Sequence, residues 1–567
     1  MDSSGKFNYY FRKYTLVRLV CAVFIIGIAL AIVYFIGFKR RPVPVIDSIN
    51  PSVGSPGDVV VINGKNFGEI RDMSYVEFAG SKLTSSSYIS WNDTQIKMVL
   101  PSNVQDGLVV VGVKNQRSKP ALFANEVDIP VPVTQTFQST KPKITALSSS
   151  KLGVGSLLTI YGSNFGSTRG QSKVCFTSDY NKSVSNAAYV SSVILTENNV
   201  AASDFDYDYE FWNSEEIRVR VPDGAYSGVV FVDTGKEQSD PVEFVVSAAG
   251  GTKSYDSKKI YLVQYTADIN DFVSSDSATI TLRCPVPQLV PSQPSLEFTE
   301  ISPSPVLQNY QNCIIHQLIK NKSNTSKTVF KQTFVVPVYE INTKVNEAGI
   351  GAYKNMNQLL YEKYTKSDGF VPVDDEEIIE LAAEIVGKET NAYKKAKLIY
   401  TYMLENYSLS SSLRKDDADP KDLLKRNKGD AYDYAVIFTA LARAAGIPAL
   451  VDCGVLIGQD LQTQSHWWCE VYLYGFGWMP VDVSLGDGLE YKQWTDNIEA
   501  ESYYFGNLDS HHLLFSRGYN ELKPFTQDNK IVKYPKSFAL QNIWEEASSN
   551  TSKYSSFWSL PSINGVY

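Results

Sequence analysis

The sequence predicts a multidomain, mainly β-sheet protein with one N-terminal transmembrane helix and an α+β domain near its C-terminus. Its 567 residues exceed what one hydrophobic core supports, because domains usually hold ~100–200 residues. A repeat of two β-rich segments fills much of the N-terminal half, and helical periodicity begins only near residue 350. Tyrosine, at 35 copies, is typical of sheets with polar-tipped aromatic surfaces.

Charge and cysteine content exclude several classes of protein. A net charge of -8 and a pI near 5.3 supply no basic surface, so we expect no nucleic acid partner. The six cysteines lack paired spacing, and we expect neither a metal nor a cofactor. Cys284 and Cys313 fall in one predicted domain, where they could form a disulfide or remain two buried thiols.

Residues 19–38 form an uncharged apolar run that predicts a membrane-spanning helix. At 1.5 Å per residue the run matches the ~30 Å hydrocarbon core of a bilayer. A cleaved signal peptide would have a shorter run and a small-residue cleavage site, which the following FKRRPVP lacks. Basic residues are nearly balanced on both sides and only slightly favour a cytoplasmic N-terminus. We expect residues 1–41 to be a cytoplasmic stub and uncleaved signal-anchor, with the bulk of the chain extracytoplasmic.

Two β-rich segments repeat along the chain. Residues 46–68 recur at 144–166 with an offset of 98, and residues 91–101 recur at 212–222 with an offset of 121. The second copy therefore holds 23 additional residues between its halves. Alternating runs such as VVVING and IRVRV are typical of short, half-buried antiparallel strands. We expect two β-sandwiches, over 42–130 and 141–247.

Both copies resemble the IPT/TIG family of immunoglobulin-like domains. The motif G-x-N-F-G at 64–68 and 162–166 and the motif W-x-x-x-x-I at 91–96 and 212–217 occur in the family's order. The resemblance implies seven-stranded sandwiches that serve as spacers or as ligand-binding modules, generally on bacterial cell-surface or secreted proteins. Both roles stay open, because a fold alone does not fix a function.

The insertion of the second copy carries alternating acidic residues. Asp204, Asp206 and Asp208, with Glu215 farther on, imitate part of a calcium-binding loop. Tyr209 occupies the position where such a loop needs glycine for its sharp turn. The sequence therefore predicts a solvated acidic loop without a metal.

Two further regions flank the α+β domain. Residues 258–345 contain alternating runs and predict a β-domain, in which His316 is a half-buried strand residue. Residues 491–567 are rich in aromatic side chains and predict a C-terminal extension packed on the preceding domain. His511 and His512 are adjacent, so on a strand they point to opposite sides and cannot chelate one ion together.

Residues 350–490 carry the motifs that point to chemistry. Asp430 can cap a helix from about Ala431, and a glycine can end this helix near residue 446. Two strands follow, and His466 and Trp468 share a face of the first. Asp482 ends the second strand.

These motifs resemble the transglutaminase-like superfamily, which has a papain-type fold. R-x-x-G-I-P-A at 443–449, H-x-W-x-E-V at 466–471 and G-W-x-P-V-D at 477–482 occur in the family's order. The resemblance implies that His466 is the catalytic histidine, that Asp482 orients it and that Trp468 shapes the cleft. The family's nucleophilic cysteine, however, falls on Ala431.

The loss of this cysteine changes the expected function. A thiol at a helix N-terminus beside an imidazolium ionises readily and attacks an amide carbonyl, whereas a methyl group forms no acyl intermediate. Loss of such a nucleophile costs on the order of 10⁶ in turnover. We do not expect Cys453 or Cys469 to reach His466.

We therefore expect a membrane-anchored surface protein with a catalytically degenerate domain that binds or scaffolds peptide, protein or cell-wall material. The alternatives are an active amidase, peptidase or cross-linking enzyme with a non-standard nucleophile, or a purely structural protein. His466 and Asp482 would then be either a buried hydrogen-bonded pair or a remnant site that still contacts a ligand.

Overall fold

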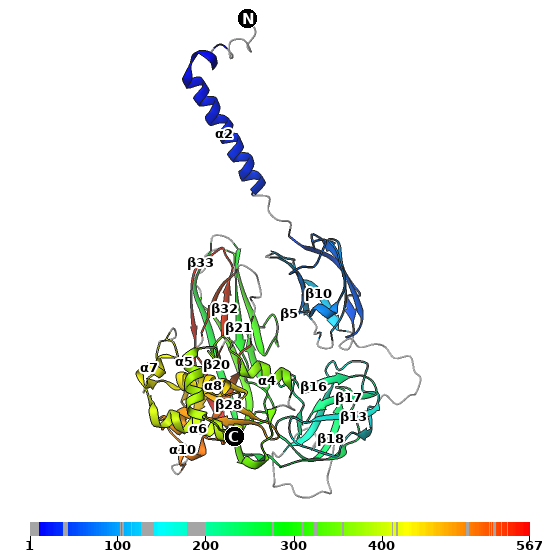
Figure 1. The fold of residues 1–567 in the computed structure, drawn as a ribbon, viewed down its shortest axis with the longest axis vertical. Coiled ribbons are helices and arrows are strands. Elements are labelled where there is room, and N and C mark those ends of the chain that lie inside the picture. Colours follow the sequence, from blue (N-terminus) through cyan, green and yellow to red (C-terminus); the bar gives the residue numbers. More distant parts are fainter. Residues whose placement is uncertain are drawn as a thin grey trace. The chain divides into compact units, whose positions relative to one another are not determined.

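The computed structural model divides into two compact units, residues 1–132 and 133–567. Figure 1 shows the elements of each unit. The residues that the structure describes are 9, 11–37, 43–101, 104, 107–114, 116–125, 141–178, 199–274, 277–308, 310–321, 327–353, 357–410, 412–415, 418–494, 498–520, 522, 524, 529–534, 536–540 and 543–567.

The apolar N-terminal run lies on helix α2, Thr15–Gly37. None of the described helices combines the length and the apolar character that a membrane span requires. The transmembrane helix predicted over 19–38 is therefore not supported.

The first repeat folds as two sheets that enclose one core. One sheet has the strand order β1-β3-β7-β6 and the other β2-β10-β8-β4-β5, with β9 paired to β8. The core includes Phe67 and Val111, which are fully buried. The strands are β1 (Val45–Asn50), β2 (Val53–Gly54), β3 (Val59–Lys65), β4 (Tyr75–Phe78), β5 (Ser81–Lys82), β6 (Tyr88–Trp91), β7 (Gln95–Val99), β8 (Gly107–Val113), β9 (Gln116–Arg117) and β10 (Ala121–Asn125), with a 3-10 turn at Ser85–Ser87.

The second repeat has the same strand order. One sheet runs β11-β13-β17-β16 and the other β12-β19-β18-β14-β15. These strands are β11 (Lys143–Leu147), β12 (Lys151–Leu152), β13 (Leu157–Ser163), β14 (Lys173–Ser178), β15 (Asn199–Ala201), β16 (Tyr209–Trp212), β17 (Glu216–Arg220), β18 (Ala225–Asp233) and β19 (Val242–Val246).

The structure explains why G-x-N-F-G recurs in both sandwiches. A Cβ on Gly162 would collide with the carbonyl oxygen of Lys143, and Asn164 adopts a left-handed conformation with φ 61°. Phe165 fills the core, and its carbonyl accepts a hydrogen bond of 3.1 Å from the indole of Trp212. The first copy repeats this arrangement, with an indole hydrogen bond of 2.9 Å from Trp91 to the Phe67 carbonyl.

Residues 251–345 and the C-terminal tail form a third pair of sheets. The long strands β20 (Gly251–Ser274) and β24 (Thr328–Val345) pair along most of their length, with β33 on the other side of β20 (Figure 1). The tail thus adds strands to this β-domain, a pairing that the sequence prediction did not include. The remaining strands are β21 (Ser277–Pro285), β22 (Glu297–Ser302), β23 (Cys313–Asn321), β31 (Lys530–Lys533), β32 (Trp544–Ala547), β33 (Thr551–Trp558) and β34 (Ser562–Val566).

Two predictions for this β-domain can be compared with the structure. His316 is 1% exposed, so it is fully rather than half buried, and its Nε2 lies 2.9 Å from the amide nitrogen of Gln332. Cys284 pairs across the sheet with Ile314, while Cys313 pairs with Pro285. Neighbouring register positions face opposite sides of a sheet, and both cysteines are free thiols.

The α+β region packs helices on one face of the sheet β29-β28-β27-β30. Residues Ala431 to Arg443 of helix α8 are all buried, and Val451, Cys453 and Trp467 join the same core from the sheet. Its elements are α4 (Gln358–Thr365), α5 (Glu376–Val386), α6 (Ala392–Asn406), β25 (Ser408–Leu409), α7 (Asp422–Arg426), β26 (Lys428–Gly429), α8 (Ala431–Ala444), β27 (Ala449–Ile457), β28 (Thr463–Leu473), β29 (Gly477–Val481), α9 (Val483–Gly486), α10 (Ala500–Tyr503) and β30 (His512–Arg517), with a 3-10 turn at Glu347–Gly349 before α4.

The opposite face of this sheet is also covered by protein. Trp468 of β28 packs with Tyr255 of β20 and with Tyr339 and Ile341 of β24. The sheet therefore lies between α8 and the long strands, and the side chains of both faces are shielded from water.

The acidic insertion is buried instead of solvated, which corrects the sequence prediction. Asp206 and Asp208 are 6% and 5% exposed. The Asp206 carboxylate accepts hydrogen bonds from the Trp478 indole at 2.9 Å and from Arg517 at 3.3 Å. Asp204 instead pairs with Arg169. The loop joins the second sandwich to the α+β region, because Asp206 accepts hydrogen bonds from Trp478 and Arg517 of that region.

We predict that Asp206→Ala destabilises residues 133–567 by about 2–3 kcal/mol, because it leaves a buried indole N–H without an acceptor and Arg517 with one fewer carboxylate. Asp204→Ala is the matched control, since the Asp204 side chain is 68% exposed and an exposed ion pair contributes ~0–1 kcal/mol. Urea denaturation of both variants measures the difference. Equal losses of unfolding free energy in the two variants would contradict the role of Asp206 in joining the second sandwich to the α+β region.

Candidate functional site

The first candidate element is the N-terminus of helix α8. The Asp430 side chain accepts the backbone N–H of Asp433 at 3.0 Å, and the Asp433 side chain accepts the N–H of Asp430 at 2.9 Å. This capping box satisfies two of the free donors at the start of the helix. Ala431 is the first helical residue, as the sequence predicted, and it is 5% exposed.

The segment 536–540 covers this helix start. The Lys536 ammonium lies 3.1 Å from the Asp430 carboxylate and 5.1 Å from the centre of the Tyr432 ring. Lys536 therefore contacts the residues on either side of Ala431 in the chain. The Lys536 side chain is 1% exposed. Leu540, at the other end of the segment, joins the core that contains α8.

The predicted His466 and Asp482 do lie together. The Nε2 atom of His466 is 2.5 Å from the Oδ2 atom of Asp482, and neither side chain is exposed. The Oδ1 atom of Asp482 accepts hydrogen bonds of 2.9 Å from the Leu485 N–H and the Ser484 hydroxyl. Burial raises the pKa of Asp482, but attraction and hydrogen bonding by His466 and His512 outweigh it and hold this pKa well below its usual range.

A second histidine, His512, completes the cluster. Its Nε2 lies 3.1 Å from the same Asp482 oxygen, and its Nδ1 lies 2.8 Å from Asp509. Burial lowers the pKa of His512, while Asp509 and Asp482 more than compensate and raise it to about 9. The sequence analysis missed this role, since His512 reaches the site only through the pairing of β30 with β27.

His511, the neighbour of His512, points elsewhere. Its ring stacks on Trp494 with centroids 4.7 Å apart, and its Nδ1 lies 3.1 Å from the Tyr261 hydroxyl. The two adjacent histidines therefore do not share one ligand, as the sequence predicted.

The two nearby thiols are occupied and buried. The Cys469 thiol donates to the Ala435 carbonyl at 3.2 Å, and the Cys453 thiol donates to the Ser537 carbonyl at 3.2 Å. Burial raises the pKa of both thiols well above the ordinary value. Both cysteines belong to the core around α8, whereas His466 stacks on Trp468, which packs on the other face. Neither thiol is placed to act with His466.

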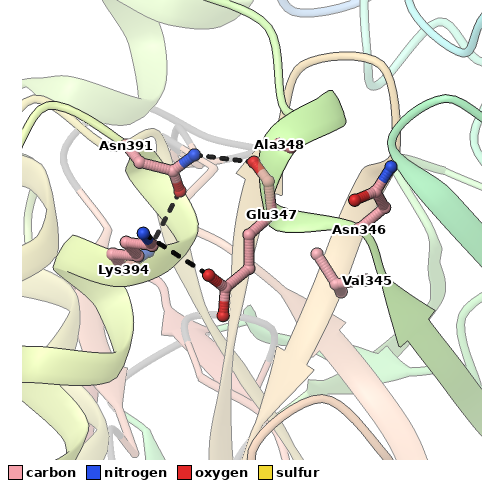
Figure 2. Close-up of a pocket in the computed structure, with 6 residues that line it drawn as sticks. All are labelled: Val345, Asn346, Glu347, Ala348, Asn391 and Lys394. Atoms are coloured by element: carbon pink, nitrogen blue, oxygen red, sulfur yellow. Dashed lines mark hydrogen bonds and ion pairs between the residues drawn. The ribbon is translucent and has the colours of Figure 1, made fainter.

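The predicted cleft is closed. His466 and Asp482 have no exposed surface, and Trp468 is 3% exposed. A surface hollow lies elsewhere, where Asn391 and Lys394 of α6 face Glu347 (Figure 2). None of the four predicted site residues lines that hollow. The Nδ1 atom of His466 is buried and has no hydrogen-bond partner among the described residues.

A second buried polar cluster surrounds Arg517. Its Nε donates to Glu470 at 2.6 Å, and its guanidinium carbon lies 4.9 Å from the centre of the Trp478 ring. Asp452 is 2% exposed, and its Oδ1 atom has no hydrogen-bond partner in the described part of the chain. Burial, followed by repulsion from Glu470, raises the pKa of Asp452 well above its usual value.

Sequence comparison matches two parts of the chain to known families. Residues 379–483, which hold Ala431, His466 and Asp482, match the transglutaminase-like superfamily. The chain contains a transglutaminase-like domain. Residues 44–125 match the IPT/TIG domain, in agreement with the resemblance of the first sandwich.

Curated relatives share only parts of the chain. An uncharacterized protein of Haemophilus influenzae is 30% identical over 192 residues, which span 29% of this chain and 49% of that protein. A cyclomaltodextrin glucanotransferase of Paenibacillus macerans is 31% identical over 86 residues, which span 15% of this chain and 12% of the enzyme. The chain thus matches half or less of the length of these relatives.

Solved structures give distant matches. A structure described as a putative cysteine protease from Cytophaga hutchinsonii aligns over 56% of this chain and 91% of its own, at 14% identity and a TM-score of 0.34. The periplasmic domain of TgpA from Pseudomonas aeruginosa aligns over 40% of this chain and 87% of its own, at 12% identity and a TM-score of 0.23.

We predict that Asp452→Asn weakens the pH dependence of unfolding. A carboxyl whose pKa is raised by folding stabilises the folded state fully below its unfolded pKa, near 3.8, and loses that contribution as the pH rises toward the raised value. The wild-type denaturation midpoint should therefore fall more steeply than that of the variant as the pH rises above the unfolded pKa. Asp460→Asn is the control, because Asp460 forms a surface ion pair with Lys492. Parallel profiles for Asp452→Asn and wild type would contradict the prediction.

Proposed function

We propose that the transglutaminase-like domain is non-catalytic and that the protein works as a binding or scaffolding protein for peptide or cell-envelope material. The observation that carries this proposal is the buried helix start, where Ala431 stands in place of the nucleophile and is 5% exposed, while Lys536 contacts its neighbour Asp430. An acyl-transfer site needs a nucleophile and an open path to the scissile carbonyl.

The retained His466 and Asp482 fit this proposal as a structural pair. Both side chains are buried, and Asp482 has hydrogen bonds to both of its oxygens. Such a pair stabilises the end of β29 and the start of α9 without any substrate. The same His466–Asp482 pair is also the observation that favours the competing function, an amidase or cross-linking enzyme with an unusual nucleophile.

The IPT/TIG match supports an extracytoplasmic location as part of the same proposal, because the resemblance implies a surface or secreted protein. The two sandwiches would then have different tasks. The second is joined to the transglutaminase-like domain through Asp206, whereas the first belongs to a separate compact unit. The first sandwich is the better candidate for contact with a binding partner.

Turnover assays test the proposal on the full chain. We expect no ammonia release from a glutamine peptide, with or without an added amine, above the level of His466→Ala. Removing the histidine should change nothing, because no acyl intermediate forms. Turnover that His466→Ala abolishes would overturn the proposal and favour the enzyme.

A thiol placed at residue 431 tests the closure itself. We predict that Ala431→Cys reacts slowly with iodoacetamide, and that adding Lys536→Ala speeds alkylation roughly tenfold, equivalent to ~1.4 kcal/mol of easier local opening. Ala431→Cys with Lys533→Ala is the matched control, because Lys533 is exposed and lies over Trp544 instead. Mass spectrometry of the peptide that contains residue 431 measures each rate. Equal rates in both double variants would show that Lys536 does not close this position.

A further inference from the structure

His466, Asp482 and His512 converge in a way that a hydrogen-bonded pair does not require. Each offers one ligand atom, and the three atoms lie within 4.8 Å of one another. They come from β28, from the end of β29 and from β30, so the sheet itself fixes their spacing. None of the three side chains is exposed.

Further hydrogen bonds orient two of these three side chains, Asp482 and His512. The Leu485 N–H and the Ser484 hydroxyl occupy the Oδ1 atom of Asp482 and leave Oδ2 for the two imidazoles. The Nδ1 atom of His512 lies 2.8 Å from the Oδ1 atom of Asp509, and this contact holds the ring with its Nε2 toward Asp482. Carboxylates that orient histidines in this way are typical of metal sites.

Asp509 is itself held as an anion. Its Oδ2 accepts from the Tyr504 hydroxyl at 2.8 Å, and its Oδ1 accepts from the His511 N–H at 2.9 Å. Two buried carboxylates, Asp482 and Asp509, therefore place two negative charges in a layer of side chains with little exposed surface. Such charges persist only when positive charge lies beside them.

Two protons or one divalent cation could supply that charge. Two protons would make both His466 and His512 imidazolium ions. One divalent cation would instead be bound by the three side chains together, whose ligand atoms already lie within 4.8 Å of one another. Its charge would balance both buried carboxylates at once.

We infer that His466, Asp482 and His512 form a structural site for a divalent transition metal, with zinc as the best match to two imidazole nitrogens and one carboxylate oxygen. Zinc binds such atoms at ~2.0–2.2 Å in tetrahedral sites. The His466 and Asp482 atoms, now 2.5 Å apart, separate to roughly 3.3 Å around an ion at those bond lengths. Because the site is closed to solvent, the ion enters as the domain folds.

This inference replaces the expectation from sequence that the chain holds no metal. The sequence alone does not predict this site, because its three ligands are far apart along the chain. His512 also lies next to His511, which does not belong to the site. The inference is independent of the proposed function, since a structural ion needs no nucleophile at residue 431.

The test uses the full-length chain, which is unfolded in denaturant that contains a chelator and is then freed of the chelator. The chain is refolded with one equivalent of Zn²⁺, and a desalting column removes unbound ions. We expect about one zinc per chain by elemental analysis in wild type. His512→Gln should lose the ion, and Asp509→Asn should bind it roughly 10–100-fold more weakly. His511→Gln is the matched control, since His511 is buried next to His512 but stacks on Trp494, and it should keep the ion. Circular dichroism confirms that each variant is folded.

Two results would overturn the inference. One is a folded wild type that retains no zinc after refolding. The other is equal zinc retention by wild type and His512→Gln. Neither result depends on turnover, so the metal site and the non-catalytic proposal can fail separately.

Discussion

Burial of both faces of the sheet β29-β28-β27-β30 is the constraint on which the rest of the transglutaminase-like domain depends. One face packs on α8, and Trp468 on the other face packs on β20 and β24. Polar groups in such a layer lose water and must find partners inside the protein. The clusters around Asp482 and Arg517 meet this demand on the sheet face opposite α8, through charge pairing that a solvent-exposed sheet would not need.

The same burial determines what the inherited site can do. In a cleft, an imidazole and a carboxylate are useful because substrate can reach them, whereas here His466 and Asp482 have no exposed surface. The helix start is likewise covered by Lys536. The chain thus retains the geometry of an acid–base pair while it lacks both the thiol and the access that acyl transfer requires.

The two sandwiches show how one fold serves two structural tasks. Both use the same glycine, asparagine and phenylalanine corner, because the close approach of two strands and a left-handed residue demand them. Only the second carries the insertion, and Asp206 in that insertion binds Trp478 and Arg517. The insertion therefore ties the second sandwich to the transglutaminase-like domain.

Periodicity and motif order in the sequence determined the two sandwiches, the cap at Asp430, the start of α8 and the meeting of His466 with Asp482. These features depend on neighbouring residues or on two adjacent strands, so local patterns encode them. Tertiary structure alone decided the burial of Asp206, the cover by Lys536, the tail strands in the β-domain and the arrival of His512 beside Asp482. Each of these features needs contacts between segments far apart in the chain. A local sequence pattern does not indicate which distant side chain will pair with a buried charged group.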